Sequence, residues 1–373
     1  MSDEAVDEST RRVLDGTTWE EFCDTLKAAG SVVLGEGAPR TPLDRAEGWR
    51  YLTRLLRAAL ETFVENGDPY APELVRTAHE TVKMGNDNPD NYYQNAPISG
   101  KQAYRITGTR GTVHYLGFGT QAGNYGATGS LDTTGYLEAR DMEIRPDGSF
   151  EIQVSVEPRP GNWLPMTPES RTLVVRQTRL DREREELAQM RIERVSGPHA
   201  PRPLQPQHLD RGLRGSALFV LGCARLFQSW AEGFEKHVNQ LPRFDAALAG
   251  AAGGDPNIVY YHSYWKLAPD QALVIEVTPP ECDYWNFQLS NHWLESLDYR
   301  YFRIHLNKHT ARLGDDGSVR VVVAHQDPGV ANWLTTAGHD RGAMCWRWIR
   351  AAQHPQPRTR VVPVAELRAE RGA

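Results

Sequence analysis

Apolar side chains recur at helical spacing through the first part of the chain. One face is formed by Trp49, Leu52, Leu56, Leu60 and Phe63. Because steps of three and four residues place side chains on one side of an α-helix, this stretch predicts a helix. Asp44, followed three residues later by Glu47, resembles a capping box at its start. Further helices are predicted over residues 17–30 and 71–84, so about the first 85 residues are expected to be helical.

From residue 86 the pattern changes to the alternation of polar and apolar residues that is typical of β-strands. In the stretch SFEIQVSVE (149–157), the apolar positions are Phe150, Ile152, Val154 and Val156. A period of two gives a strand one buried face and one wet face. The stretch RTLVVRQT (171–178) is the expected partner strand.

A long apolar stripe predicts a second helical segment between two strand-rich regions. Over residues 209–242 the stripe is formed by Leu213, Ala217, Val220, Ala224, Phe227, Ala231, Phe234 and Val238. A stripe of this length indicates a helix that packs lengthwise on the rest of the protein. The Gly-rich stretch AGAAGGDPN (249–257) is typical of a connector, and strand-like patterns then resume to about residue 353.

Several short signatures occur twice, in the same order and roughly 170 residues apart. The aligned pairs are Asn162-Trp163-Leu164 with Asn332-Trp333-Leu334, Asp147-Gly148-Ser149 with Asp316-Gly317-Ser318, Tyr92-Tyr93 with Tyr260-Tyr261, and Arg176 with Arg347. Self-similarity over such a period indicates a duplicated structural unit. The Asp-Gly pairs favour tight turns between strands, because glycine accepts the positive φ that such turns require.

These patterns together predict an α+β protein. It would contain two duplicated antiparallel units of β-sandwich or jelly-roll type, an N-terminal helical region and a long bridging helix. The expected domains are an acidic tail and helical cap (1–85), a first β unit (86–200), a bridging helix with a Gly-rich connector (201–256), a second β unit (257–353) and a C-terminal tail (354–373).

The repeated stretches also resemble a known family. In the first copy they are DNPDNYYQNAPISGKQAYRITGTRG (87–111) and DGSFEIQVSVEPRPGNWLP (147–165); in the second, DGSVRVVVAHQDPGVANWLTTAG (316–338) and CWRW (345–348). They are similar to the uncharacterised proteins grouped as DUF1214, which are often fused to or related to DUF1254. The resemblance covers about residues 86–350. It implies β-sandwich or jelly-roll units and no particular reaction.

Composition narrows the classes of partner and compartment. The 373 residues carry a formal net charge of -6, whereas a nucleic-acid-binding protein is expected to show a concentrated basic face. The longest apolar run, residues 217–224, is far shorter than the roughly 20 residues of a membrane span. The N-terminus is acidic and shows no apolar signal-peptide core. We therefore expect a cytoplasmic protein without nucleic-acid or membrane partners, and a homo-oligomer is left open.

The four cysteines argue against a cysteine-based metal site. Cys23, Cys223, Cys282 and Cys345 are far apart and form no C-x-x-C pair, so neither a zinc knuckle nor a dense disulfide scaffold is indicated. Templates for phosphate loops, dinucleotide-binding loops, nucleophile elbows and zinc proteases are also missing from the sequence. No metal and no cofactor are expected.

The repeated Asn-Trp-Leu tripeptide allows two interpretations. In the structural one, tryptophan fills the gap between sheets while the asparagine side chain bonds the backbone of a turn. In the functional one, Trp163 or Trp333 stacks on a flat ligand, and Asn162 or Asn332 fixes the polar edge of that ligand. Repetition favours the structural interpretation, because both copies of a duplicated fold keep architectural parts more readily than active sites.

Histidines and arginines supply the remaining candidate site residues. His262, His292 and His339 all lie in the second copy, which makes that copy the candidate for acid-base chemistry near neutral pH. Glu295 and Asp340 are short-range carboxylate partners for the last two of these histidines.

The two aligned arginines allow two interpretations as well. Arg176 and Arg347 would either pair with carboxylates such as Asp132 or Asp298, or recognise an anionic group on a ligand.

Two functions remain open on this evidence. The first is a cofactor-independent hydrolase or lyase that acts on a small organic or sugar-like substrate in an aromatic pocket, with Tyr261 and Trp333 stacking on it. The second is a non-catalytic binder of a glycan or lipid. A histidine and a carboxylate within hydrogen-bonding reach in one concave pocket would favour the enzyme.

Overall fold

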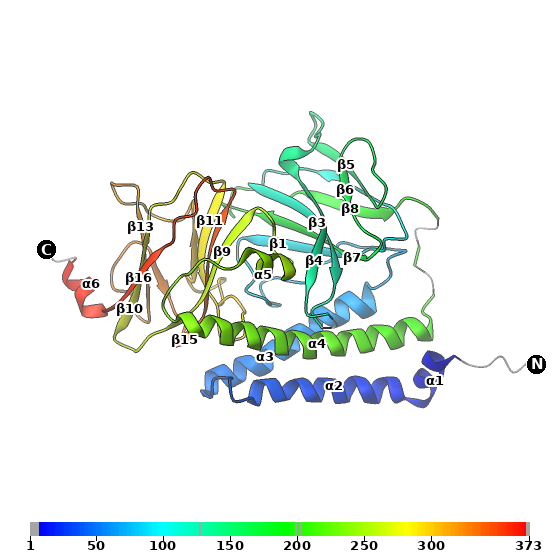
Figure 1. The fold of residues 1–373 in the computed structure, drawn as a ribbon, viewed down its shortest axis with the longest axis horizontal. Helices are drawn as coiled ribbons and strands as arrows, with labels where there is room; N and C mark the ends of the chain where they lie inside the picture. The colour runs from blue at the N-terminus through cyan, green and yellow to red at the C-terminus, as the bar shows by residue number, and fades with distance from the viewer. Residues whose placement is uncertain (1–6, 127, 198–199, 202, 371–373) are drawn as a thin grey trace, which may run out of the picture.

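Two β-sandwiches lie beside each other over a layer of helices. The computed structural model describes residues 7–370 apart from 127, 198, 199 and 202, and Figure 1 shows the sandwiches resting on the helical layer. The helices are α1 (Glu8–Asp15), α2 (Thr17–Leu34), α3 (Pro42–Leu60), η1 (Glu61–Glu65), η2 (Ala139–Asp141), α4 (Pro206–Phe234), η3 (Glu235–His237), α5 (Ala246–Ala251) and α6 (Val364–Glu370). The predicted α+β class, with N-terminal helices and a long helix between two duplicated β units, is confirmed.

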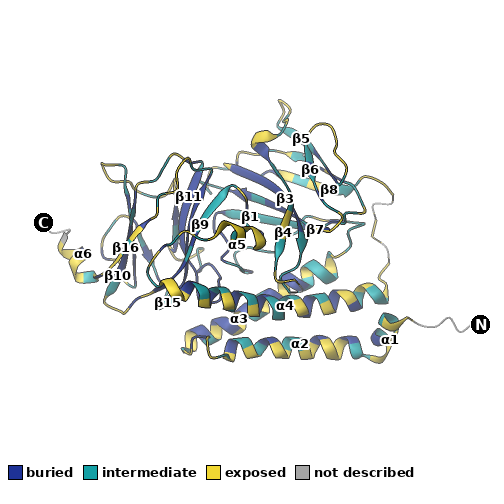
Figure 2. Cartoon of the chain, in the orientation of Figure 1, coloured by how far each residue is buried: buried dark blue, intermediate teal, exposed yellow. Residues whose placement is uncertain are grey.

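The helical layer is held to the sandwiches by a shared apolar core. Val33, Leu55 and Phe227 of α2, α3 and α4 are buried in it, and Tyr264 and Trp293 of the second sandwich close it from the other side. Figure 2 shows exposed residues along α2 and buried residues on the central strands. The apolar residues of each helix are spaced so that they form one face, and these faces pack against one another and against the sheets.

The helix expected around residues 44–63 begins slightly earlier than its sequence pattern suggests. Thr41 is the N-cap, and its hydroxyl oxygen accepts a hydrogen bond from the Asp44 backbone N–H at 3.1 Å. The capping pair is thus Thr41 with Asp44, and the predicted box of Asp44 with Glu47 is wrong. Pro42 occupies the first turn, where its missing N–H costs nothing.

Residues 71–84, expected to be helical, form no helix. Val75 pairs with Asn95, and His79 with Val82, through isolated β-bridges. Leu74 packs on the core of the first sandwich, whereas Met84 packs on the helical core. The segment spans two different cores, so its apolar residues follow tertiary contacts and not one helical face.

The first sandwich contains two four-stranded sheets, with strand orders β1-β7-β3-β4 and β6-β5-β2-β8. Its strands are β1 (Asn91–Pro97), β2 (Tyr104–Thr109), β3 (Tyr115–Gly123), β4 (Leu131–Glu138), β5 (Ser149–Ser155), β6 (Trp163–Pro165), β7 (Ser170–Thr178) and β8 (Gln189–Arg194). All pairs are antiparallel except β5 with β6. The alternating residues Phe150, Ile152 and Val154 point into its core.

The second sandwich repeats this topology, with orders β12-β11-β15-β9 and β14-β13-β10-β16. Its strands are β9 (Ile258–Lys266), β10 (Gln271–Val277), β11 (Tyr284–Leu289), β12 (His305–Asn307), β13 (Val319–Ala324), β14 (Trp333–Thr335), β15 (Arg341–Ile349) and β16 (Arg358–Pro363). Strand β16 and helix α6 lie in residues 354–373, expected to be a tail, and β16 completes a sheet by pairing with β10. Among the described residues, no helix is long and apolar enough to cross a membrane.

Strand register corrects one part of the internal alignment. Arg176 on β7 pairs with Tyr93 on β1, and Arg347 on β15 pairs with Tyr260 on β9. Tyr93 and Tyr260 are therefore the equivalent residues, one position away from the sequence alignment of Tyr93 with Tyr261. Because neighbouring residues on a strand face opposite sides, this single step moves Tyr261 into the sandwich core.

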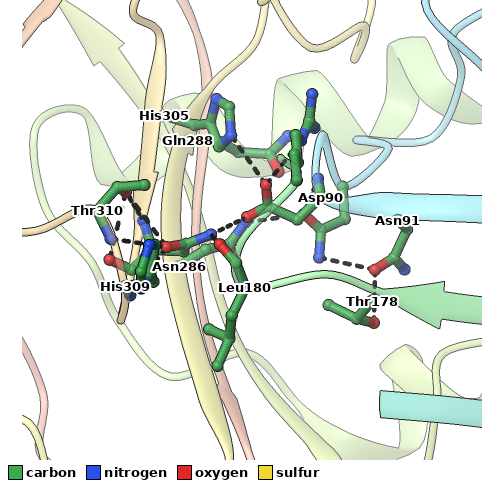
Figure 3. Close-up of polar contacts among 12 residues, drawn as sticks. Asp90, Asn91, Thr178, Leu180, Asn286, Gln288, His305, His309 and Thr310 are labelled. Atoms are coloured by element: carbon green, nitrogen blue, oxygen red, sulfur yellow. Dashed lines mark hydrogen bonds and ion pairs between the residues drawn. The ribbon is translucent and has the colours of Figure 1, made fainter. Parts of the chain in front are cut away.

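The segments that precede β1 and β9 cross over to the opposite sandwich. Asp90, just before β1, accepts a hydrogen bond from the Tyr284 hydroxyl of β11 at 2.7 Å. His305 Nε2 lies 3.1 Å from the same carboxylate (Figure 3). Arg182 Nε lies 3.2 Å from it. Burial raises the pKa of Asp90, but His305 and Arg182 outweigh it and hold that pKa well below its usual range.

The reverse contact is made by Asp255, just before β9. Its carboxylate accepts hydrogen bonds from the hydroxyls of Tyr115 at 2.8 Å and Tyr136 at 3.4 Å, both in the first sandwich. Tyr115 and Tyr284 begin the equivalent strands β3 and β11. Each sandwich therefore binds the leading segment of the other, which fixes the sandwiches against each other around the space between them.

Candidate ligand-binding cavity

One cavity of about 700 Å³ lies between the two sandwiches and the helices. The first sandwich contributes residues of β1, β3 and β7, and the second contributes residues of β9 and β15. Helices α4 and α5 and residues 252–254 of the connector line the remaining sides. Figure 1 shows α5 between the sandwiches, where it contacts β4 and β9. The volume lies within the range of about 300–1,000 Å³ that is usual for small-molecule sites.

The polar part of the cavity comes from the duplicated strands. Arg176 and Tyr93 from the first sandwich, and Arg347 and Tyr260 from the second, all line it. Each arginine is paired across strands with its own tyrosine. The Arg347 guanidinium also lies over the Tyr260 ring, 5.9 Å from its centroid. Two copies of one strand pair thus contribute to a single cavity.

The helical side of the cavity is mostly apolar, although Ser229, His237, Arg243 and Asp245 also line it. It is lined by Phe63, Met84, Phe219, Trp230, Phe234 and Phe244. The last turn of α4 opens onto this region at Gly233, where an added Cβ atom would meet nothing within 4 Å. A ligand in this space would meet aromatic and aliphatic surface on one side and guanidinium groups on the other.

Arg347 is rigidly held by the second sandwich. Its Nη1 donates to the side-chain oxygens of Gln288 at 2.5 Å and Asn286 at 3.3 Å, and its Nη2 donates to the Asn86 carbonyl at 2.6 Å. The residue is 3% exposed. All three acceptors are neutral, so this buried cation is hydrogen-bonded without being charge-neutralised.

Arg176 is held more loosely. Its Nη2 donates to the Gly253 carbonyl at 2.6 Å, and the side chain is partly exposed at the cavity that it lines. The positions equivalent to Asn286 and Gln288 are Gly117 and Gly119, which have no side chains to orient it. Asp255 nevertheless lies close enough to raise the pKa of Arg176, against the opposing effect of burial.

The carboxylate partners that the sequence suggested for the arginines are wrong. Asp298 pairs with Arg300, and Asp132 accepts a hydrogen bond from Ser130. Among the described residues, neither Arg176 nor Arg347 forms an ion pair within 4.0 Å.

Of the histidines predicted as bases, His262 lines the cavity. Its Nδ1 lies 3.0 Å from Asn86 Nδ2, and its ring stacks between Tyr260 and Phe234 at centroid distances of 5.3 and 5.2 Å. Burial, assisted by the charge of Arg347, lowers the pKa of His262 to about 3. The ring is therefore neutral near pH 7, and no carboxylate lies within hydrogen-bonding reach of it among the described residues.

The other two histidines lie outside the cavity lining. His292 bonds the Tyr264 hydroxyl and the Gln228 side chain, both at 2.9 Å, and burial lowers its pKa to about 4. His339 Nε2 lies 2.8 Å from Glu47 on α3. Its partner is thus a residue 292 positions away and not the adjacent Asp340, which pairs with Arg341.

Glu295 belongs to the same helix anchor as His339. Its carboxylate accepts hydrogen bonds from Arg54 at 2.7 Å and Asn291 at 2.9 Å, and it forms no pair with His292. Glu47 also accepts from Asn291, at 2.6 Å. This buried network clamps α3 onto the second sandwich. Within the described part of the chain, no group of three His, Cys, Asp or Glu side chains could hold a metal ion.

The Asn-Trp-Leu copies have matching architectural contacts. Asn332 Nδ2 donates to the carbonyls of Arg312 at 2.7 Å and Arg320 at 3.0 Å, while its Oδ1 accepts from the Arg312 N–H. Asn162 makes the same three bonds to the backbone of Glu143 and Glu151.

The neighbouring aromatic residues are likewise engaged away from the cavity. Trp163 and Trp333 donate to the carbonyls of Ser155 and Ala324. Tyr261 lies in the second sandwich core, with its hydroxyl bonded to the His354 carbonyl at 2.8 Å. None of these residues, nor Asn332, lines the cavity.

Sequence reasoning missed Tyr93, Tyr260 and the apolar residues of α4. The two tyrosines lie directly opposite the aligned arginines, on the neighbouring strands β1 and β9. They could have been found if the register between these strands and the arginine strands had been known. Trp230 could not have been found in this way, because it projects from a helix whose packing partners are distant in the sequence.

Comparison with known proteins adds the family. A model described as "Protein of unknown function (DUF1214)" matches residues 90–179 and 266–353, which are the two repeated regions. The chain belongs to the DUF1214 family. Both matches include the arginine strand of the corresponding sandwich, β7 or β15. No curated protein matches this DUF1214 chain.

Two solved structures resemble this DUF1214 protein. An uncharacterised protein from Burkholderia cenocepacia shares 54% sequence identity with it; the alignment covers 95% of this chain and 99% of the other, with a TM-score of 0.94. A protein from Vibrio parahaemolyticus shares 14% identity over 84% of this chain and 98% of the other, with a TM-score of 0.49.

Proposed function

We propose that this DUF1214 protein binds a small, amphipathic organic molecule of lipid-like character in the cavity between its sandwiches. The observation that carries the proposal is the two-sided wall of this cavity. Paired arginines and tyrosines from the duplicated strands face it on one side, and six apolar side chains of the helical region face it on the other. Sites of this kind bury most of a ligand against apolar surface and orient it with a few polar groups.

The geometry favours binding over hydrolysis or elimination. The close histidine–carboxylate pairs, His339 with Glu47 and His305 with Asp90, involve no cavity-lining histidine. Within the cavity, His262 is neutral and sandwiched between two rings. A general base needs a proton to abstract at hydrogen-bonding distance and a group that supports its charged form, and Asn86 is a neutral partner.

A glycan is a poorer match than a lipid-like molecule. Glycan sites present hydrogen-bonding groups to the hydroxyls on all sides of a sugar. This cavity has amide side chains such as Asn91, Asn95 and Asn124 on the sandwich side, but its helical side is mostly apolar. Burying sugar hydroxyls against Phe63, Phe219 and Met84 would leave them without partners.

The proposal is tested by blocking the cavity from α4. Gly233→Leu places a side chain in open cavity space, and leucine is also the better helix former. Binding of decanol and decanoate would be measured by calorimetry and by the shift of the unfolding midpoint. A ligand at a hundred times its Kd stabilises the native state by about 2.7 kcal/mol. We expect the wild type to bind at least one probe and Gly233→Leu to bind neither.

Gly250→Leu is the matched control. Gly250 also lies in a helix with nothing within 4 Å of an added Cβ, but it is exposed and does not line the cavity. This variant should bind as the wild type does. Equal binding by the wild type and Gly233→Leu, or no binding of either probe by the wild type, would contradict the proposal.

A further inference from the structure

We infer that the ligand is an organic anion whose acidic group binds between Arg176 and Arg347. This inference rests on the proposed function and names the chemical class of ligand for the same cavity. The ligand would direct its carboxylate, or a similar singly charged group, toward the paired strands and its apolar body toward α4. Three observations carry the inference: the convergence of the arginines, their lack of an ion-pair partner, and the difference between their surroundings.

The two arginines converge on the same small region. Tyr93 and Tyr260 each lie close enough to both guanidinium groups for Arg176 and Arg347 to favour the charged form of each phenol. Burial still raises the pKa of both tyrosines, so the phenols stay neutral. The tyrosine hydroxyls accept hydrogen bonds from backbone N–H groups, of Asn88 at 3.1 Å and of Asp255 at 3.3 Å.

Nearby carboxylates are already engaged elsewhere. Asp255 accepts two tyrosine hydroxyls and the Asn257 N–H. Asp87 accepts hydrogen bonds from the Ser296 N–H at 3.0 Å and from the Ser296 hydroxyl at 2.8 Å. The charge of Asp87 also favours the charged form of the buried Lys83, whose pKa burial lowers. The charged side chains that line the cavity are three arginines and two carboxylates: Arg176, Arg243, Arg347, Asp87 and Asp245. Asp245 is engaged as well, because it accepts the backbone N–H groups at the start of α5. The cavity wall therefore carries a net positive charge. Buried charges are usually paired, so such a site favours an anionic ligand.

The surroundings of the arginines assign them different roles. Three acceptors fix Arg347, so it provides a positioned charge at one end of the site. Arg176 has one bond, to Gly253, and glycines at the positions that would otherwise orient it. Its remaining N–H groups can therefore reach a ligand carboxylate, and charge-assisted pairs of this type are the stronger hydrogen bonds.

The test compares decanoate with decanol in variants of Arg176. The wild type is expected to bind decanoate more tightly than decanol. Arg176→Gln should weaken decanoate binding by about 10- to 100-fold, the usual cost of a lost hydrogen bond to a charged group, and leave decanol binding nearly unchanged. Arg176→Lys should retain part of the preference for decanoate, because it keeps the charge. Decanol binding also reports that each variant is folded.

Arg191→Gln on the exposed face of β8 is the control for net charge, and it should bind both probes as the wild type does. If wild type and Arg176→Gln bind decanoate and decanol alike, the head-group assignment fails while binding in the cavity stands. If the wild type binds neither probe, the proposed function fails and this inference fails with it. An undiminished preference for decanoate in Arg176→Gln would also overturn the assignment, whereas a smaller preference supplied by Arg347 would not.

Discussion

The two sandwiches share a topology but surround their equivalent arginines differently. In the second, Asn286 and Gln288 fix the buried Arg347 at the cavity wall. In the first, glycines replace these residues, and Arg176 is partly exposed at the cavity. The comparison shows how one ancestral position can yield a fixed charge in one copy and an adaptable one in the other. The copies also differ in how they are anchored, which makes the comparison testable.

The largest expected effect concerns the exchanged leading segments. Asp90→Ala removes a buried carboxylate that pairs with the half-buried Arg182 and also contacts His305 and Tyr284. It should lower the free energy of unfolding by about 3–5 kcal/mol, because breaking this pair leaves several partners in a buried region without their acceptor. Asp255→Ala should cost about 1–3 kcal/mol, since its carboxylate accepts neutral hydroxyl and N–H groups. Urea denaturation measures both. If both variants lost the same unfolding free energy, the two sandwiches would not differ in how strongly they bind each other's leading segment.

The Asn-Trp-Leu copies should instead behave alike. Asn162→Ala and Asn332→Ala each delete three hydrogen bonds between a side chain and the backbone. Each should lower the free energy of unfolding by about 1–3 kcal/mol, without changing ligand affinity. Unfolding in urea and calorimetry with decanoate measure the two quantities. A binding defect in Asn332→Ala alone would give the second tripeptide a ligand role.

The anchor of the second sandwich on α3 should make stability depend on pH. Burial alone would lower the pKa of His339, but the bond to Glu47 raises it above its ordinary 6.5. Burial alone would raise the pKa of Glu47, but the contacts with His339, Asn291 and Arg50 lower it from 4.5 to about 2. The His339 contribution is therefore complete below pH 6.5 and is lost as pH rises through the raised pKa. The Glu47 contribution is complete above pH 4.5 and is lost as pH falls toward 2.

We expect the free energy of unfolding from this pair to be greatest between about pH 4.5 and 6.5, with slopes of at most about 1.4 kcal/mol per pH unit for one proton. His339→Gln should flatten the decline above pH 6.5. Denaturation midpoints over pH 5–9 check this. An unchanged slope in His339→Gln would show that another group titrates there.

The smallest effect should come from the paired tyrosines. Tyr93→Phe and Tyr260→Phe each remove one acceptor from a backbone N–H, at a cost of about 1 kcal/mol in unfolding free energy. Tyr260→Phe keeps the ring that lies over Arg347 and should leave decanoate affinity nearly intact. Chemical denaturation and calorimetry decide this. If Tyr260→Phe lost much more unfolding free energy than Tyr93→Phe, the two tyrosines would not be equivalent.

Much of this architecture could be predicted from the sequence, because local patterns carry it. The apolar stripe of residues 213–238 predicts α4, the alternation around Ile152 predicts β5, and the recurring tripeptide reveals the duplication. Residues 71–84 mislead, because their apolar positions serve two separate cores.

The cavity could be predicted less well, since it depends on contacts between distant segments. The arginine strands align in the sequence, but the partner of His339 lies on α3, and Tyr260 faces the cavity only because of a one-residue difference in register. Cross-strand register and the packing of α4 on both sandwiches are set by tertiary contacts, which no local pattern contains.

The segments before β1 and β9 each contact the opposite sandwich, in the way that two identical subunits contact each other in a twofold-symmetric dimer. Here both halves of the interface belong to one polypeptide. Two separate copies would have to keep identical residues on both sides of such an axis. Covalent fusion removes that requirement, because a substitution then appears on one side alone. Gly117 opposite Arg176 and Asn286 opposite Arg347 are such an unmatched pair. Joining the halves in one chain thus allows a symmetric framework to enclose an asymmetric site, with distinct environments for the two ends of a single bound molecule.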